Sequence, residues 1–352
     1  MMVFGVDPHK QSHTAAAADE LGRRQAHKTV KARREGHREL IAWARGLAPG
    51  SRRWAVEDVR HVASGLVREL LAAGEEVVFV PTRLMAGTRS GGRERGKSDP
   101  IDALANARAA LREDVYLPAA RLNGQVLDVR RLSDHRADLV AERTRMINRL
   151  RWLVHDLDPA LAPAPRTLSR TRKARRQLET GLCALPPSAG RRIALSLLAA
   201  VTIATGEIAG LDEDLSALVT RLCPELLTIC GIGPVSAARI LGETGDIRRF
   251  RSVAAYARHN GTAPIPASSG TRDVHRLNRG GNRQLNAAIH RAALVQARCH
   301  DGAKALLNRR AATIRETPKS ALRVLKRHLS DVIYRALHAD AWRLDDPAQQ
   351  AA

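Results

Sequence analysis

Two acidic residues stand where the sequence predicts the ends of buried strands. Asp7 follows the apolar run Val3–Val6, and Glu57 follows the run Trp54–Val56. A charge at the end of a buried apolar strand is unfavourable unless it has a function or a partner, so both residues are candidates for a functional site. Two further acids, Asp99 and Asp102, are three residues apart on an expected helix and therefore share one face.

Four carboxylates at one point repel each other unless a cation neutralises them. Two Mg²⁺ ions held about 4 Å apart by such acids are the usual design for phosphoryl transfer. Each acid also has an ordinary explanation, because Asp99 could be a first-turn charge favoured by the helix dipole, and Asp58 could take the place of Glu57. The spacing thus predicts a magnesium site without excluding purely structural roles.

A glycine-rich turn lies further along the chain, between two expected helices. The segment 227–241, which contains Gly231 and Gly233, matches the helix-hairpin-helix pattern. Its glycines permit a sharp turn, and the second helix would present its N-terminal amides to a phosphate of the DNA backbone. The alternative is a packing corner between two helices.

A stiff loop rich in proline, serine and glycine follows at residues 261–270, and it contains Ser268 and Ser269. A serine hydroxyl beside cations and phosphate-holding amides can attack a phosphodiester, although Ser-Ser-Gly is far more often a turn. Several basic residues follow within a short stretch, namely Arg272, His275, Arg276, Arg279 and Arg283. A second basic stripe on one expected helical face, either solvated or phosphate-bound, comprises Lys319, Arg323, Lys326 and Arg327.

The charge balance indicates a polyanionic partner. The 352 residues include 58 Lys and Arg against 36 Asp and Glu, which gives a formal net charge of +22. Such an excess is typical of proteins that neutralise nucleic-acid phosphates.

The elements around the first acids predict an α/β domain. Expected strands at 3–6, 12–18, 28–32, 54–56 and 77–80 alternate, after the first three, with helices at 36–48 and 61–73. A strand meander followed by alternating helices and strands suits an RNase H-like fold. The helix that carries Asp99 and Asp102 is expected to run to about residue 112.

The middle of the chain predicts long helices. Leu132, Leu139, Met146 and Leu153 recur at intervals of seven, which indicates a coiled-coil hairpin, a dimer seam or an ordinary long helix. Another helix is expected at 190–222, with a break near Gly206–Gly210.

Other classes are disfavoured. Four scattered cysteines without a CxxC pair argue against zinc and are expected to be buried free thiols. No apolar run approaches the roughly 20 residues of a membrane span, and the N-terminus does not resemble a signal peptide. We therefore expect a cytoplasmic, nucleoid-associated protein that meets no membrane.

Together these motifs resemble the Piv-like family of DNA invertases and insertion-sequence transposases. The resemblance covers most of the chain, and Thr262 and Asn286 depart from it, where the family often has Leu and Arg. The matching segments, in the family's order, are 5–10, 56–57, 96–103, 231–234, 250–252, 261–264, 268–270 and 281–283.

The resemblance implies three regions. They are a RuvC-like DEDD metal-binding domain at 1–118, a helical coiled-coil or linker region at 119–222, and a mostly α-helical transposase domain with the helix-hairpin-helix at 223–345. It makes Asp7, Glu57, Asp99 and Asp102 the Mg²⁺ ligands. Ser269, or failing that Ser268, would be the nucleophile that bonds transiently to DNA. It also implies a structured non-coding guide RNA.

Strand exchange between four DNA ends needs at least two protomers, so a homodimer or homotetramer is expected. Two alternatives stay open at this stage. One is a metal-dependent nuclease or resolvase that cuts by water attack, and the other is a DNA-binding protein without catalysis.

Overall fold

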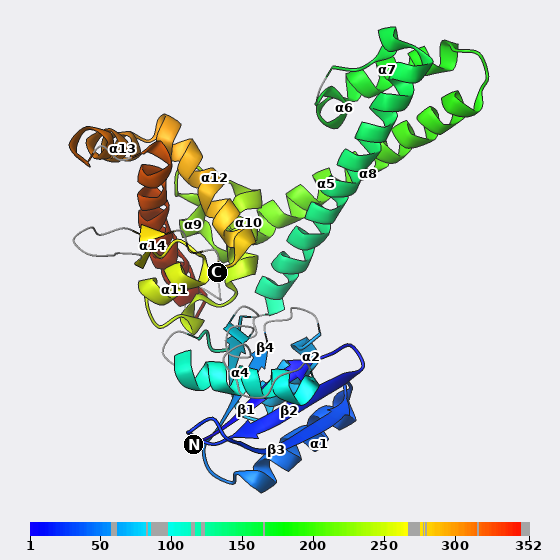
Figure 1. Cartoon of the computed structure of the whole chain (residues 1–352). Coiled ribbons are helices and arrows are strands. Elements are labelled where there is room, and N and C mark those ends of the chain that lie inside the picture. Colours follow the sequence, from blue (N-terminus) through cyan, green and yellow to red (C-terminus); the bar gives the residue numbers. More distant parts are fainter. Residues whose placement is uncertain are drawn as a thin grey trace. The chain divides into compact units, whose positions relative to one another are not determined.

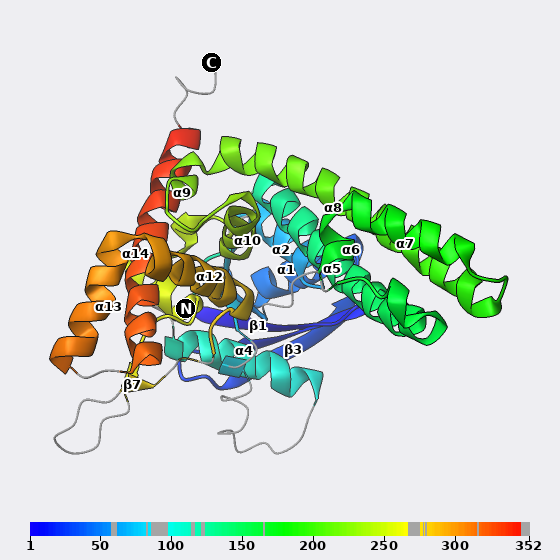
Figure 2. The same cartoon turned by 90° about the horizontal axis from the view of Figure 1, so that it is seen from above.

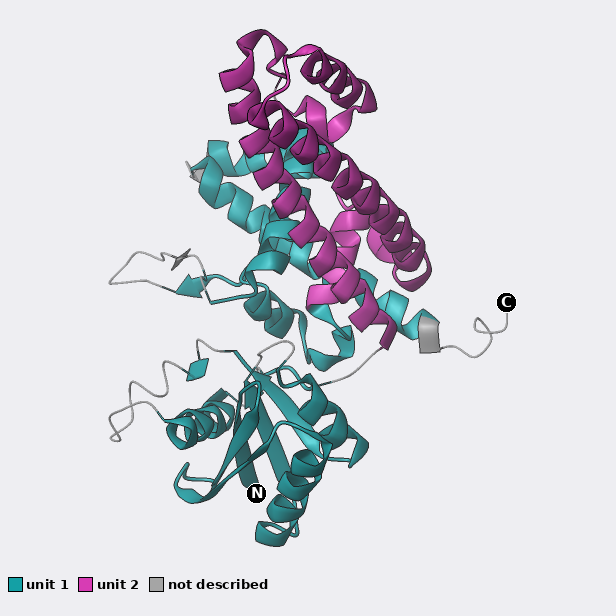
Figure 3. Ribbon diagram, turned by 90° about the vertical axis from the view of Figure 1, so that its right-hand side faces the viewer, with its two compact units in different colours: residues 1–123, 244–352 teal, residues 124–243 magenta. Residues whose placement is uncertain are grey.

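The structure is a computed structural model of the whole chain, and it divides into two compact units (Figure 3). Residues 1–123 and 244–352 form unit 1, and residues 124–243 form unit 2. The residues that the structure describes are 1–57, 62–81, 84–85, 98–113, 117–120, 124–164, 166–266, 275–276, 278, 280–314 and 317–345, without the side chains of 275–276, 313–314 and 344–345.

A five-stranded mixed sheet organises the N-terminal part of unit 1. Its strands are β1 (Met2–Pro8), β2 (Ser12–Ala18), β3 (Arg24–Lys31), β4 (Arg52–Glu57) and β5 (Glu76–Val80), in the order β3-β2-β1-β4-β5. The first three pair antiparallel, and β4 and β5 continue parallel to β1. The predicted meander followed by alternating elements is therefore confirmed, and the arrangement is consistent with an RNase H-like domain.

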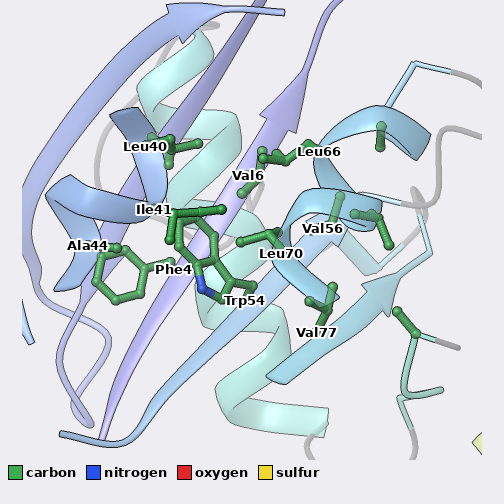
Figure 4. Packing of buried hydrophobic residues seen from close by; sticks show 14 of the residues in the cluster. Phe4, Val6, Leu40, Ile41, Ala44, Trp54, Val56, Leu66, Leu70 and Val77 are labelled. Atoms are coloured by element: carbon green, nitrogen blue, oxygen red, sulfur yellow. The ribbon is translucent and has the colours of Figure 1, made fainter. Parts of the chain in front are cut away.

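One face of the sheet is covered by α1 (Arg34–Leu47) and α2 (Ser64–Ala72). Phe4 stacks on Trp54 there with ring centroids 5.0 Å apart, and Leu40 and Leu70 close over them from the two helices (Figure 4). Glu75, in the turn after α2, accepts hydrogen bonds from Arg45, Arg52 and the Trp54 indole; this ties the sheet to α1.

The opposite face is covered by α4 (Asp99–Glu113), which crosses β1 and β2 (Figure 1). The approach is close enough to require glycine at position 5. A Cβ atom on Gly5 would lie 2.0 Å from the Ala103 carbonyl oxygen and 2.4 Å from the Ala107 amide nitrogen. The backbone of α4 thus rests directly on the central strand.

Unit 2 is built on a pair of long helices that lie side by side, α5 (Gly124–Leu157) and α8 (Ala189–Leu222) (Figure 1). Arg136 pairs with Asp212, and Arg143 donates to Thr205, so the two helices run antiparallel. Helix α5 therefore packs along another helix of the same chain, and the dimer seam that the heptads also allowed stays a prediction. Short elements connect the two helices and pack around Leu182 at one end: η2 (Pro159–Leu161), α6 (Thr167–Arg170) and α7 (Arg172–Ala184).

Helix α8 corrects two sequence-based expectations. It is continuous through Gly206 and Gly210, because burial of Ala204 and Ile208 against α5 outweighs the roughly 1 kcal/mol that each glycine costs. It is also long and apolar enough, by length and composition alone, for a membrane span. The expectation that no apolar run approaches the length of a membrane span was therefore wrong. Alanine, threonine and glycine separate the larger apolar residues of this helix, but they add little polarity, so the mean hydropathy of the segment stays high.

The turn that contains Gly231 lies between α9 (Pro224–Leu227) and α10 (Pro234–Thr244). Gly231 has φ +86°, in the left-handed region that favours glycine. Gly233 is exposed, and a Cβ atom added there would meet open space. Arg239 holds the following helix against α5 through Asp134 and the carbonyl of Ser133.

The C-terminal part of unit 1 is mostly helical. Its elements are η3 (Ile247–Arg249), α11 (Val253–His259), the short hairpin of β6 (Ile265–Pro266) and β7 (His275–Arg276), α12 (Arg283–Cys299), α13 (Asp301–Ile314) and α14 (Pro318–Asp345). Helices α12 and α13 both pack against α14 (Figure 2).

The four cysteines form no disulfide, but Cys183 and Cys299 are exposed rather than buried as expected, because each lies on a solvated helix face.

Candidate metal centre

The sheet register brings the two strand-end acids to one face. Val6 on β1 lies opposite Val56 on β4, so the next residues along the parallel strands, Asp7 and Glu57, are neighbours. Side chains alternate along a strand, and Asp7 and Glu57 therefore project to the face of Gly5 and Ala55, which α4 covers. Both side chains are buried.

The other two acids lie in the first turn of α4. Asp102 is buried and Asp99 is half exposed, so the three-residue spacing puts one acid inside the domain and one at its surface. The helix N-terminus carries a partial positive charge that favours carboxylates there. One turn further on, Asn106 donates to the Val6 carbonyl at 2.8 Å and so fixes α4 to the strand beside Asp7.

His9 joins this cluster from the end of β1. Its Nε2 lies 3.1 Å from Asp7 Oδ2 and 3.5 Å from Asp99 Oδ1. One ligand atom from each of Asp7, His9 and Asp99 falls within 4.8 Å of the others.

The electrostatics of Asp7 identify it as the centre of the group. Burial raises the pKa of its carboxyl to about 6, and His9 opposes that rise while Glu57, Asp102 and Asp99 add to it. Glu57, Asp99 and Asp102 therefore all lie close enough to Asp7 to interact with its carboxyl.

The donor set fits a divalent cation. Three buried or half-buried carboxylates surround Asp7 with one imidazole to offset them, and an ion would relieve their repulsion. Carboxylate oxygens are the ligands that Mg²⁺ prefers, and a histidine is tolerated by Mn²⁺ and other transition metals.

The remaining predicted site residues are placed less completely. Ser268, Ser269, Arg272 and Arg279 lie outside the described residues. Arg276 lies in β7, opposite Ile265. Arg283 is exposed at the start of α12, and Gly231 and Gly233 form the turn before α10.

Sequence reasoning missed His9 and Asn106 as members of this region. The only signal for His9 was its place just after the predicted strand that ends at Asp7. Helical periodicity could have indicated Asn106, which is four residues after Asp102 and on the same face.

Two protein families match the chain. A DEDD transposase family of the IS110 type, described as "Transposase", matches residues 4–159. The "Transposase IS116/IS110/IS902 family" matches residues 223–308. The first match contains the acidic cluster, and the second contains the Gly231 turn and the serine loop.

Whole-length relatives agree with these matches. The insertion element IS116 44.8 kDa protein of Streptomyces clavuligerus is 30% identical over 82% of this chain and 83% of its own length. The insertion element IS900 42 kDa protein of Mycobacterium paratuberculosis is 26% identical over 93% of both chains. The mini-circle putative transposase for IS117 of Streptomyces coelicolor is 27% identical over 81% of this chain and 82% of its own.

A mixed sheet with a DEDD-type acidic cluster, joined to a helical C-terminal region, defines a DNA transposase. More particularly, the chain belongs to the IS110/IS116 family of insertion-sequence transposases.

Proposed function

We propose that this transposase cleaves and rejoins DNA strands at a Mg²⁺ site formed by Asp7, Glu57, Asp99 and Asp102. The observation that carries the proposal is the gathering of all four acids around a carboxyl whose pKa is raised to about 6. Burial of the Asp7 carboxyl, with the added repulsion of the other acids, favours binding of a cation, and phosphodiester chemistry is what clustered acids with Mg²⁺ commonly perform.

A bound metal would polarise a phosphodiester oxygen and offset the charge that develops on it. The protein's own contribution is to hold the acids in place. The β1–β4 register aligns Asp7 with Glu57, and the Asn106 bond to Val6 fixes the helix that carries Asp102. His9 contacts both Asp7 and Asp99 at the exposed side of the cluster.

For the attacking group we propose Ser269, with Ser268 as the alternative. The serine Oγ would form a bond to phosphorus while the bond from phosphorus to one strand's oxygen breaks, and that oxygen leaves as a hydroxyl with the serine proton. Attack by the hydroxyl of another strand reverses the step and restores the serine. One phosphoester bond replaces another in each step, so rejoining the strands requires no separate energy source.

The second candidate is a RuvC-like reaction in which water attacks and no covalent intermediate forms. It is favoured by one observation, namely that the acidic cluster alone could support it. The resemblance of the serine loop to that of the Piv-like family favours the first candidate.

Trapping of protein–DNA adducts separates the two. Wild-type protein incubated with DNA of the element's ends and Mg²⁺ should give a covalent adduct on a denaturing gel, and Ser269→Ala should abolish it while DNA binding persists. Adducts that survive in both Ser269→Ala and Ser268→Ala would refute the serine assignment. Strand cleavage without any adduct would support water attack.

The expected partners follow from the same proposal. We infer that the Gly231 turn acts as a helix-hairpin-helix that contacts the DNA backbone, aided by the arginines at 272, 276, 279 and 283. A structured guide RNA would account for part of the net charge of +22. We further propose that the three regions at 1–118, 119–222 and 223–345 divide the metal site, the helical spacer and the serine loop, and that a dimer or tetramer acts at the nucleoid in the cytoplasm.

A further inference from the structure

A basic hollow of about 780 Å³ lies between α12 and α14, at the base of the segment that carries the two serines. Its lining includes Gly261 and Gly281, which mark the two ends of that segment. A Cβ atom on Gly281 would lie 2.3 Å from the Gly261 amide nitrogen, so the two ends touch backbone to backbone. The hollow is therefore fixed in position relative to the stem of the serine loop.

The titratable side chains that line the hollow are all basic. They are Arg283, His290, Lys319, Arg323 and Lys326. On α12, Arg283 and His290 are seven residues apart, and on α14 the same interval separates Lys319 from Lys326, so each pair lies on one helical face. The stripe noted in the sequence thus faces the hollow, except for Arg327, which pairs with Asp331.

Lys326 is the distinctive member. It is only 8% exposed, and its Nζ donates to Asn286 Oδ1 at 2.7 Å. Among the described residues no carboxylate pairs with it. A buried ammonium that lacks a counter-charge is unfavourable, and an anion in the hollow would supply that charge.

A chain of hydrogen bonds holds this lysine in register with the serine segment. Asn286 Nδ2 donates to the Asn260 carbonyl at 2.8 Å, and Asn260 Oδ1 accepts from the Thr262 amide and hydroxyl. Asn260 also donates to Ser330 on α14 at 2.8 Å. Thr262 and Asn286, the two positions that depart from the family resemblance, therefore belong to one network that leads to Lys326.

We propose that this hollow is a phosphodiester-binding subsite, in which Lys326 and the exposed Arg323 hold one backbone phosphate of a nucleic-acid strand at the base of the serine loop. The inference rests on the proposed function, because a strand must lie near the serines for them to act on it. A phosphate brings the missing negative charge, and both DNA and RNA can supply it.

Equilibrium binding of the full chain at several salt concentrations tests the subsite. Arg323→Gln and Lys326→Met should each weaken binding about five- to twenty-fold, and should lower the slope of log affinity against log salt by about 0.9. Because the proposal has both residues hold the same phosphate, the double variant should lose about 0.9 from the slope, as each single variant does.

Arg327→Gln is the matched control, since it removes one charge from the adjacent position but not from the hollow. Equal losses from Arg327→Gln and Arg323→Gln would overturn the proposal in favour of a diffuse basic surface. Arg323 is exposed, so its variant remains informative if Lys326→Met fails to fold.

Separate measurements with a DNA duplex and with an RNA hairpin identify the source of the phosphate. Loss with either probe supports the subsite and names its occupant, and loss with neither overturns it. Strand cleavage by the same variants keeps the two proposals apart. If the variants lose binding but the wild-type protein cuts no DNA, the proposed function alone is refuted. If the wild-type protein cuts DNA but the variants bind as tightly as it does, the subsite alone is refuted.

Discussion

At the scale of single residues, the buried carboxylate of Asp7 destabilises the folded state, and a bound metal ion would offset this destabilisation. Its folded-state pKa of about 6 lies above the ordinary 3.8, so the folded protein holds a proton more tightly than the unfolded chain does. The unfavourable contribution grows as the pH rises from about 4 to 6 and is complete above 6. A rise of about two pKa units corresponds to about 3 kcal/mol.

We therefore expect Asp7→Asn to raise the free energy of unfolding by about 1–3 kcal/mol in metal-free buffer at pH 7.5, and to raise the melting temperature accordingly. The gain should disappear near pH 4, where the wild-type carboxyl is protonated. Added Mg²⁺ should stabilise the wild type and not the variant. Scanning calorimetry would measure both effects, with Asp138→Asn, at an exposed acid on α5, as the control. A lower melting temperature for Asp7→Asn than for the wild type would show that Asp7 has a structural role instead.

His13 acts in the opposite direction. Burial and the neighbouring His37, whose ring stacks on it at 5.1 Å, lower the pKa of His13 to about 4. The neutral ring contributes stability above the unfolded pKa of about 6.5, and this contribution is lost as the pH falls through 6.5 towards 4.

The prediction is that His13→Phe, which keeps a ring against His37, makes the protein less sensitive to acid between pH 6.5 and 4. Because Asp7 and His13 act in opposite directions in the wild type, Asp7→Asn should make the acid loss steeper, and the slope of the double variant should lie between the slopes of the two single variants. Urea unfolding at intervals of half a pH unit measures these slopes. Identical slopes for the wild type and His13→Phe would contradict the assignment.

At the scale of elements, the contact between β1 and α4 brings the acidic cluster together. The helix can reach the strand only because position 5 has no side chain. Gly5→Ala should therefore destabilise the N-terminal part by more than about 3 kcal/mol, since rigid backbone, not a flexible side chain, opposes the new methyl. Gly46→Ala in α1, where the added atom meets open space, should be neutral or slightly stabilising. Circular dichroism melts of the two variants compare them, and similar melting temperatures would show that α4 can move away from β1.

The sequence predicted the elements of this region well because the strands are apolar and the helices end at clear signals. It placed Asp7 and Glu57 at strand ends, although the β1–β4 register that makes them neighbours comes from long-range pairing. It overlooked His9, an exposed residue after Pro8 without an apolar pattern around it. It also predicted a break in α8, because local propensity at Gly206 carries no information about the partner helix.

At the scale of the whole molecule, charge and apolar surface indicate different partners. The basic hollow suits a polyanion, whereas the long helices of unit 2 expose large apolar side chains. Trp152 on α5 is 77% exposed and Ile203 on α8 is 70% exposed. Exposed apolar side chains of this size are typical of protein interfaces.

We expect these residues to contribute to the homo-oligomer proposed above. Ile203→Glu and Trp152→Glu should each weaken self-association at least ten-fold, because a carboxylate would have to be buried in the contact. Leu294→Glu changes an exposed apolar residue of α12 in the same way and should leave self-association intact. Sedimentation velocity over a range of protein concentrations measures the effect. If Ile203→Glu, Trp152→Glu and Leu294→Glu all associate as the wild type does, the oligomer forms through another surface. If all three variants weaken self-association equally, the added negative charge is responsible and not the loss of apolar contacts on α5 and α8.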